Sequence, residues 1–278
     1  MNSSSFYYMM VVKTVFFLPV VEGLLTFIDY PTYNRAMEMI KSKDNARIKN
    51  AKKLYKKKYR TSSYLIEGRH LYEEALKAGV SFKQVFVTEK FADLADAILV
   101  SDDVMKFLSD AETPQGIIAE VVMPTFATQD FSKLLILENV QDPGNVGTMI
   151  RTADAAGFSA VVLTDGSADS YSPKVLRTMQ GAHFHLPVFQ ESDALAFYNR
   201  LKASGITVIA TTLSDQSIDY RTLSTYDKFA LIMGNEGAGI LPETAQAADI
   251  LAHINMPGQA ESLNVAIAAG ILMFSLTD

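Results

Sequence analysis

The second half of the chain alternates short, continuously apolar runs with amphipathic stretches of helical spacing. The apolar runs are residues 134–137, 160–163, 206–210, 229–233 and 250–254. The helical patterns are residues 147–156, 173–179, 195–203, 242–248 and 263–276. A strand that is apolar on both faces must be covered on both faces, which is typical of a parallel sheet between two helical layers. The pattern therefore predicts an α/β domain with a parallel sheet.

The stretch before it, residues 39–124, predicts a smaller α/β unit. Strands are expected at residues 64–68, 85–87, 97–100 and 116–122, and helices at 42–59, 71–78 and 104–109. Residues 124–133 have the Pro, Thr, Asp and Ser content of a linker. A chain of 278 residues is long enough for two domains, and we expect them at 39–124 and 131–278.

Residues 1–38 form an apolar extension whose segment 6–28 resembles a membrane span. Lys13, Pro19 and Glu22 interrupt this segment, so it lacks the ~18 uninterrupted apolar residues that a spanning helix needs. No positively charged segment precedes it, as a signal peptide would require. Two interpretations stay open: an extension packed on the protein, or a stretch absent from the functional product, with translation starting at Met37 or Met39.

Basic residues are concentrated in one tract, although the chain as a whole is acidic. The net charge is -6, yet residues 41–60 hold ten Lys and Arg against one acid, Asp44. Such a block suits binding to nucleic-acid phosphates, and the alternative is a solvated helix face. The candidate RNA contacts are Lys49, Lys52, Lys53, Lys56, Lys57, Lys58 and Arg60.

The absence of cysteine excludes disulfides, thiolate catalysis and iron–sulfur clusters, and it suits a cytoplasmic protein. The four histidines show no H-x-x-x-H spacing, so no metal site is expected. His183 and His185 alternate along a strand-like segment, which would place both on one face. Nothing nearby completes a nucleophilic triad, and a structural role or RNA contact is expected for them.

Three segments follow apolar runs of the parallel sheet, where ligands bind in such folds. In residues 139–151, Gly144 and Gly147 allow a tight turn, and Asn145 is expected to cap the following helix, which carries Arg151. This segment is either an anion site or an ordinary capped turn.

The second segment, residues 232–240, surrounds Glu236 with glycines. It matches neither a P-loop nor a G-x-G-x-x-G fingerprint. In the third, residues 254–271, Ser262 and Asn264 occupy capping positions, and an Ala- and Gly-rich stretch follows. That stretch allows tight helix packing or a dimer seam.

Together the three segments resemble the motifs N-x-G-x-x-x-R, G-N-E-G-x-G and S-L-N-V-A-x-A of the SpoU/TrmH family of SPOUT RNA ribose methyltransferases. The resemblance implies a trefoil-knotted sheet, S-adenosylmethionine bound in the knot, and an active site completed in a homodimer. It also implies that residues 39–124 are an RNA-binding domain similar to those of ribosomal and kink-turn proteins. The expected reaction is methylation of a ribose 2′-OH in RNA, with 23S rRNA favoured over tRNA.

The resemblance also assigns roles to residues. The catalytic positions are Asn145, Arg151, Glu236, Ser262 and Asn264. The cofactor-binding positions are Thr211, Leu213, Gly234, Ile254, Met256 and Leu263. Because a guanidinium normally stays protonated, we expect Arg151 to stabilise the developing alkoxide and the neighbouring phosphate, and the proton acceptor stays open.

Two rivals to this interpretation remain. One is a noncatalytic RNA-binding or assembly factor, against which the intact motif residues argue. The other is a Rossmann-type methyltransferase acting on a small molecule, which lacks its early glycine-rich loop.

Overall fold

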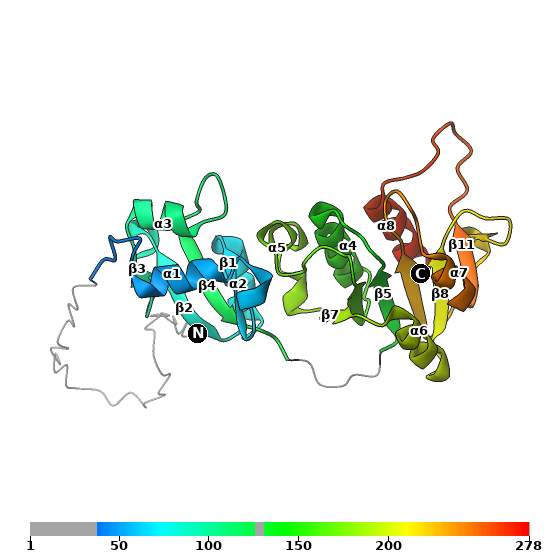
Figure 1. The fold of residues 1–278 in the computed structure, drawn as a ribbon, viewed down its shortest axis with the longest axis horizontal. Helices are drawn as coiled ribbons and strands as arrows, with labels where there is room; N and C mark the ends of the chain where they lie inside the picture. Colours follow the sequence, from blue (N-terminus) through cyan, green and yellow to red (C-terminus); the bar gives the residue numbers. More distant parts are fainter. Residues whose placement is uncertain (1–37, 126–130, 278) are drawn as a thin grey trace, which may run out of the picture. The chain divides into compact units, whose positions relative to one another are not determined.

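The computed structural model describes residues 38–125 and 131–277, which contain two sheets (Figure 1). Residues 1–37 of the predicted apolar extension 1–38 lie outside this range, and so do the expectations for them. The first sheet has the strand order β1-β4-β2-β3. Its strands are β1 (Ser63–Glu67), β2 (Phe82–Val87), β3 (Ile98–Leu99) and β4 (Ile117–Val122). Since β4 is antiparallel to β1 and β2 while β3 is parallel to β2, the first three strands all end at one edge.

Three helices cover the first sheet. Helices α1 (Ala46–Lys53) and α3 (Asp102–Leu108) share one buried cluster with Phe86 of β2. Helix α2 (Arg69–Lys77) packs through Leu71 and Ala75 on the other cluster, with Ile66 of β1. The sheet is therefore covered on both faces.

The basic helix is shorter than predicted. It ends at Lys53 instead of residue 59, and a separate 3-10 turn follows at Lys57–Tyr59. Lysines at positions 52, 53, 56 and 57 would stand three and four residues apart on a continuous helix, where like charges destabilise it. The tract is thus a helix followed by irregular chain.

The second sheet has seven strands, all parallel, in the order β7-β6-β5-β10-β8-β11-β9. The strands are β5 (Lys133–Leu137), β6 (Ala160–Thr164), β7 (Val188–Glu191), β8 (Thr207–Thr211), β9 (Ile218–Asp219), β10 (Phe229–Met233) and β11 (Ile250–His253). The predicted parallel sheet is confirmed. Strands β7 and β9 escaped prediction because they are short, partly exposed edge strands without a continuous apolar run.

Helices cover both faces of this sheet, as the continuously apolar strands require. One layer holds α4 (Pro143–Ala155), α5 (Pro173–Met179) and α8 (Val265–Ser275), and the other holds α6 (Ala194–Ala203) and α7 (Pro242–Ala247). Along β5, Leu135 and Leu137 contact the first layer, while Leu134 and Ile136 contact the second.

The two histidines do not share a face as predicted. The segment is a 3-10 turn, Ala182–Phe184, and not a strand. His183 is buried, with Nε2 2.8 Å from the hydroxyl oxygen of Tyr64, whereas His185 is exposed near Asp154. Burial lowers the pKa of His183 to about 3, so this ring is neutral and structural.

Candidate functional site

The order of the second sheet places the ends of β5, β10, β8 and β11 side by side. Because all strands are parallel, the loops that follow these four emerge at the same edge. The loop after β5 leads into α4, the loop after β10 holds Glu236, and the loop after β11 leads into α8. The three motif segments therefore converge.

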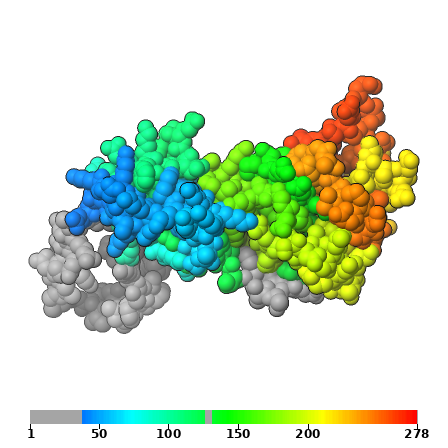
Figure 2. Space-filling view, in the orientation of Figure 1, coloured from blue at the N-terminus to red at the C-terminus, as the bar shows by residue number. Residues whose placement is uncertain are grey.

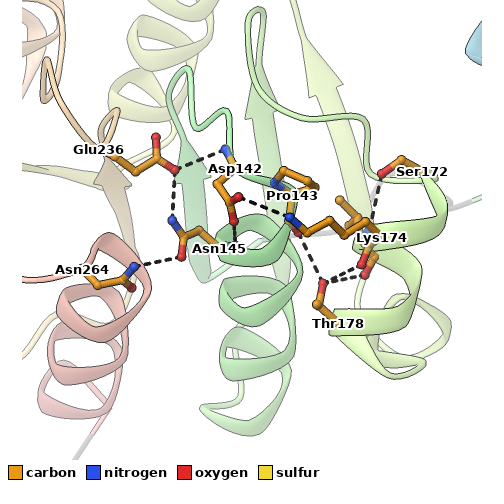
Figure 3. A network of polar contacts seen from close by, with 9 residues as sticks. Asp142, Pro143, Asn145, Ser172, Lys174, Thr178, Glu236 and Asn264 are labelled. Atoms are coloured by element: carbon orange, nitrogen blue, oxygen red, sulfur yellow. Dashed lines mark hydrogen bonds and ion pairs between the residues drawn. The ribbon is translucent and has the colours of Figure 1, made fainter.

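Asn145 joins the three motifs through its side chain (Figure 3). Its Nδ2 donates to Oε1 of Glu236 at 3.2 Å, and its Oδ1 accepts a hydrogen bond from Nδ2 of Asn264 at 3.1 Å. Glu236 and Asn264 are exposed and Asn145 is half-buried, so the network reaches the surface, where a substrate can contact it.

Helix capping explains why the side chain of Asn145 is available, and it corrects one prediction. Asp142, not Asn145, caps α4, accepting from the backbone N–H of Asn145 at 2.8 Å, with Pro143 opening the helix. Asn264 caps α8 as expected, through Oδ1 and the N–H of Ala266. Its Nδ2 stays free to donate to Asn145.

Glu236 is held as a carboxylate. Partial burial acts to raise its pKa, but hydrogen bonds from its own backbone N–H, from the Asn145 side chain and from the Asp142 backbone outweigh burial. The net pKa lies below the ordinary value of a glutamate. Glu236 is therefore a weak base and a good hydrogen-bond acceptor.

Arg151 and Ser262 lie outside this network. Arg151 is exposed on α4, six residues after Asn145, which turns it about 120° around the helix axis. Its guanidinium makes no hydrogen bond or ion pair with residues 38–125 or 131–277. Ser262 is exposed in the loop before α8. The structure thus brings together three of the five predicted catalytic residues.

A cavity of about 360 Å³ opens beside Glu236, at the ends of β8, β10 and β11. All six predicted cofactor positions line it: Thr211, Leu213, Gly234, Ile254, Met256 and Leu263. Glu236 and Ser262 line it as well. The exposed loop 254–264, orange-red in Figure 2, projects beside it. The volume is within the range of small-molecule sites, about 300–1,000 Å³.

Known proteins match both halves of the chain. Residues 132–274 match the SpoU rRNA Methylase family, and residues 45–119 match the MRM3-like substrate binding domain. The chain belongs to the SpoU rRNA methylase family. This SpoU family member is 44% identical over 248 residues to the 23S rRNA (guanosine(2553)-2′-O)-methyltransferase RlmP of Bacillus subtilis, a match that covers 86% of this chain and 99% of the relative.

Solved structures of family members agree with the fold. The AdoMet-bound rRNA methyltransferase of Sinorhizobium meliloti matches with a TM-score of 0.75 and 32% identity, covering 86% of this SpoU chain and 97% of its own. The SpoU methyltransferase AviRb of Streptomyces viridochromogenes, in complex with AdoMet, matches with a TM-score of 0.73 and 25% identity, covering 84% and 97%.

Two residues that support the site escaped sequence reasoning. Glu138, at the end of β5, is buried and accepts hydrogen bonds from Tyr198, from Thr244 and from the backbone of Leu241. Asn235 donates to the carbonyl of Asn139 at 2.9 Å. Both tie the loop after β5 to the loop after β10, on which the SpoU motifs lie. The sequence did hold one signal for Glu138, because it is a single acidic residue that directly follows the apolar run 134–137.

The basic tract is only partly available to RNA. Arg60 is buried and paired with Asp169, and the ammonium of half-buried Lys52 donates to the carbonyls of Leu108 and Ser109. We therefore withdraw these two from the predicted RNA contacts, because intramolecular partners hold their charges. Lys49 pairs with Asp44 but is exposed, and the remaining predicted contacts are also exposed: Lys53, Lys56, Lys57 and Lys58.

Within residues 38–125 and 131–277, no group of three or more His, Asp or Glu side chains could hold a metal ion. In the same part of this SpoU chain, no helix is long and apolar enough to span a bilayer.

Proposed function

We propose that this protein transfers a methyl group from S-adenosylmethionine to a ribose 2′-OH of RNA, with large-subunit 23S rRNA as the substrate. The observation that carries the proposal is the hydrogen-bonded set Glu236–Asn145–Asn264 at the mouth of the 360 Å³ cavity. The relationship to RlmP, a 23S rRNA 2′-O-methyltransferase, supports the choice of RNA.

The cavity suits S-adenosylmethionine by its chemistry. Apolar side chains such as Leu263 and Met256 line one part and can contact the adenine, while the strand ends present backbone polar groups. Glu236 and Glu261 offer negative charge to a cationic ligand. When bound, the cofactor supplies an electrophilic methyl group on a sulfonium.

The protein must then position the 2′-OH, whose proton is lost to bulk water at this surface site as the new O–CH3 bond forms. An arginine stays protonated, so Arg151 donates to the developing alkoxide and to the adjacent phosphate. The lowered pKa of Glu236 makes it a poor proton acceptor. We assign Glu236 and Asn264 instead to fixing the amide of Asn145, and Ser262 to ordering the loop before α8.

RNA is held by the first half of the chain. We take residues 39–124 as the substrate-binding domain and 131–278 as the methyltransferase domain, which agrees with the family matches to residues 45–119 and 132–274. The exposed lysines of the tract, Lys49, Lys53, Lys56, Lys57 and Lys58, contact phosphates.

The active enzyme is a cytoplasmic homodimer with a trefoil knot. Helix α8 is apolar around its whole circumference, and Ile267 and Phe274 are 57% and 46% exposed, which favours burial against a second copy. Arg151 does not join the network of its own chain, which supports its action in a partner subunit. The knot would form where the chain returns from β11 to pack α8 on α4.

Methyl transfer to protein-free RNA tests the proposal. Purified protein with tritiated S-adenosylmethionine is expected to label 23S rRNA at one ribose and to leave tRNA unlabelled. Label in tRNA alone would move the substrate to tRNA. Binding of rRNA and cofactor without any turnover would favour a noncatalytic assembly factor.

A further inference from the structure

A second and larger cavity, of about 840 Å³, belongs entirely to the first half of the chain. It opens where β1, β2 and β3 end and β4 begins, because its lining residues follow or precede those strands. Carboxyl ends of parallel strands are the usual place for a ligand in an open α/β sheet. None of its lining residues belongs to the cofactor cavity.

One wall of this second cavity is aromatic and apolar. The ring of Phe91 packs against the backbone of Gly116, where a Cβ would lie 3.3 Å from Cε2 of Phe91. Gly116 has a φ of +86°, a conformation that favours glycine, and a Cβ at this position would also lie only 2.8 Å from Oγ1 of Thr88. Val100 and Met105, both buried, complete the apolar part. A flat ring beside an apolar floor suits a planar heterocycle.

Unused polar groups lie beside that wall. Within the described residues, neither the hydroxyl of Thr88 nor the side-chain amide of Gln115 makes a hydrogen bond, and Thr88 is only 8% exposed. The carboxylates of Glu89 and Asp102 also line the cavity. Hydroxyl, amide and carboxylate groups are suited to the mixed donors and acceptors on the edge of a nucleobase.

Cations stand at the rim. Lys90 and Lys106 are exposed and make no ion pair with any described residue, and the ammonium of Lys90 lies 5.2 Å from the centroid of the Phe91 ring. Arg69 also lines the cavity but is paired with Glu73 at 2.6 Å. These two lysines are not held in ion pairs, although Glu89 and Asp102 line the same cavity, and they can contact the phosphates that flank a base.

We propose that this cavity binds one unpaired nucleotide of the RNA substrate, with its base against Phe91 and its flanking phosphates on Lys90 and Lys106. A paired base is stacked on both faces and cannot enter, so the site selects single-stranded RNA. The choice of RNA as ligand rests on the proposed function, while the selection for an unpaired base rests on the cavity itself. A nucleotide bound here is distinct from the one methylated beside Glu236.

Binding of two matched RNA probes tests the proposal. Fluorescence anisotropy measures the affinity of the full chain for a short, labelled single-stranded RNA of mixed sequence and for the same strand annealed to its complement. The variant Phe91→Leu removes the aromatic face, and its single-strand affinity is expected to fall by about tenfold. Lys90→Glu and Lys106→Glu, both on the surface, are each expected to weaken the single strand several-fold. Duplex affinity is expected to change by less than about twofold.

Lys77→Glu is the control, because Lys77 is an exposed lysine at the other end of α2 and does not line the cavity. Equal reductions in affinity for Lys77→Glu and Lys90→Glu would overturn the proposal, since the effect would then be general charge. Equal reductions for single strand and duplex would overturn it too.

Methylation assays separate the two proposals. If all three cavity variants methylate 23S rRNA with wild-type turnover and unchanged KM, nucleotide binding in the cavity is rejected and the proposed methyltransferase function stands. If the cavity binds single-stranded RNA but the protein shows no methylation, the proposed methyltransferase function is rejected and nucleotide binding in the cavity stands.

Discussion

Asn145 and Glu236 are 91 residues apart in the chain, yet Nδ2 of Asn145 lies 3.2 Å from Oε1 of Glu236. This contact joins the start of α4 to the loop after β10 at the mouth of the cofactor cavity. The amide of Asn145 is thereby fixed in orientation, with its oxygen toward Asn264.

Replacing Asn145 should therefore impair catalysis and leave stability unchanged. Asn145→Ala is expected to lower kcat by about 10²–10³-fold, as loss of a preorganised polar group does in other enzymes. Because the side chain of Asn145 bonds only to the exposed residues Glu236 and Asn264, the melting temperature is expected to stay unchanged. Asn145→Asp keeps the shape but removes the donor to Glu236, and turnover near wild type in this variant would show that the donated bond is dispensable.

Arg151 should matter for turnover and not for folding, because its guanidinium has no partner within the described residues. Arg151→Lys retains the charge and removes the planar fork, and a kcat at least about tenfold lower is expected. Arg200→Lys on α6 is the matched control and should behave as wild type. Steady-state methylation of 23S rRNA measures both, and equal rates for the two variants would contradict the role given to Arg151.

The cofactor cavity is sensitive to bulk at Gly234. A Cβ at this position would overlap the backbone of Gly239 and Ile240, which cannot move away cheaply. Gly234→Ala is expected to weaken S-adenosylmethionine binding by at least about tenfold in isothermal titration. Gly258→Ala, whose Cβ would meet no atom within 4 Å, should bind normally. An unaffected Gly234→Ala would remove that loop from the cofactor site.

The basic tract divides into residues for RNA and a residue for stability. Replacing Lys53, Lys56, Lys57 and Lys58 by Ala should reduce the slope of log K against log salt by about 1 for each phosphate that is no longer neutralised. Arg60→Ala should instead lower the free energy of unfolding by about 3 kcal/mol, since it leaves Asp169 without its partner. Salt titrations and urea unfolding distinguish the two effects, and an unchanged salt slope in the lysine variant would exclude the tract from RNA binding.

His183 should make the fold acid-sensitive. Its pKa is about 3 in the folded protein because of burial, against about 6.5 when unfolded. Between about pH 3 and pH 6.5, His183 therefore binds a proton in the unfolded state but not in the folded state. The free energy of unfolding falls as the pH drops below about 6.5. Between pH 7.5 and 5 the decrease from this group is about 2 kcal/mol. His183→Gln should abolish this part of the pH dependence in urea unfolding, and an unchanged dependence would contradict the assignment.

Much of the fold was predictable because the central strands are apolar on both faces. The runs 134–137, 160–163 and 229–233 correspond to β5, β6 and β10 within one residue. The edge strands β7 and β9 have no such run, since one side of each lacks a neighbouring strand. The prediction made helix α1 too long because it used only the spacing of apolar residues and did not consider the repulsion among the lysines.

The spacing of the motifs predicted the residues of the site. It did not predict the partners of those residues that are distant in the chain, which only the structure shows. The capping role given to Asn145 belongs to Asp142, and Pro143 at the first helical position was a readable signal for that. The partner of His183 is 119 residues away, and that of Arg60 is 109 away. A local sequence pattern cannot predict a contact between residues that are so far apart in the chain.

Those two contacts also bear on how substrate choice could be transferred between enzymes. Tyr64 and Ile66 of the first sheet share one buried cluster with Met179 and Ala182 of the second half, and His183 and Asp169 reach back to Tyr64 and Arg60. A cut between residues 125 and 131 would therefore divide a hydrophobic core that both halves build. A working chimera would have to exchange the residues on both sides of that core together, so the two halves are expected to evolve, and to be engineered, as a matched pair.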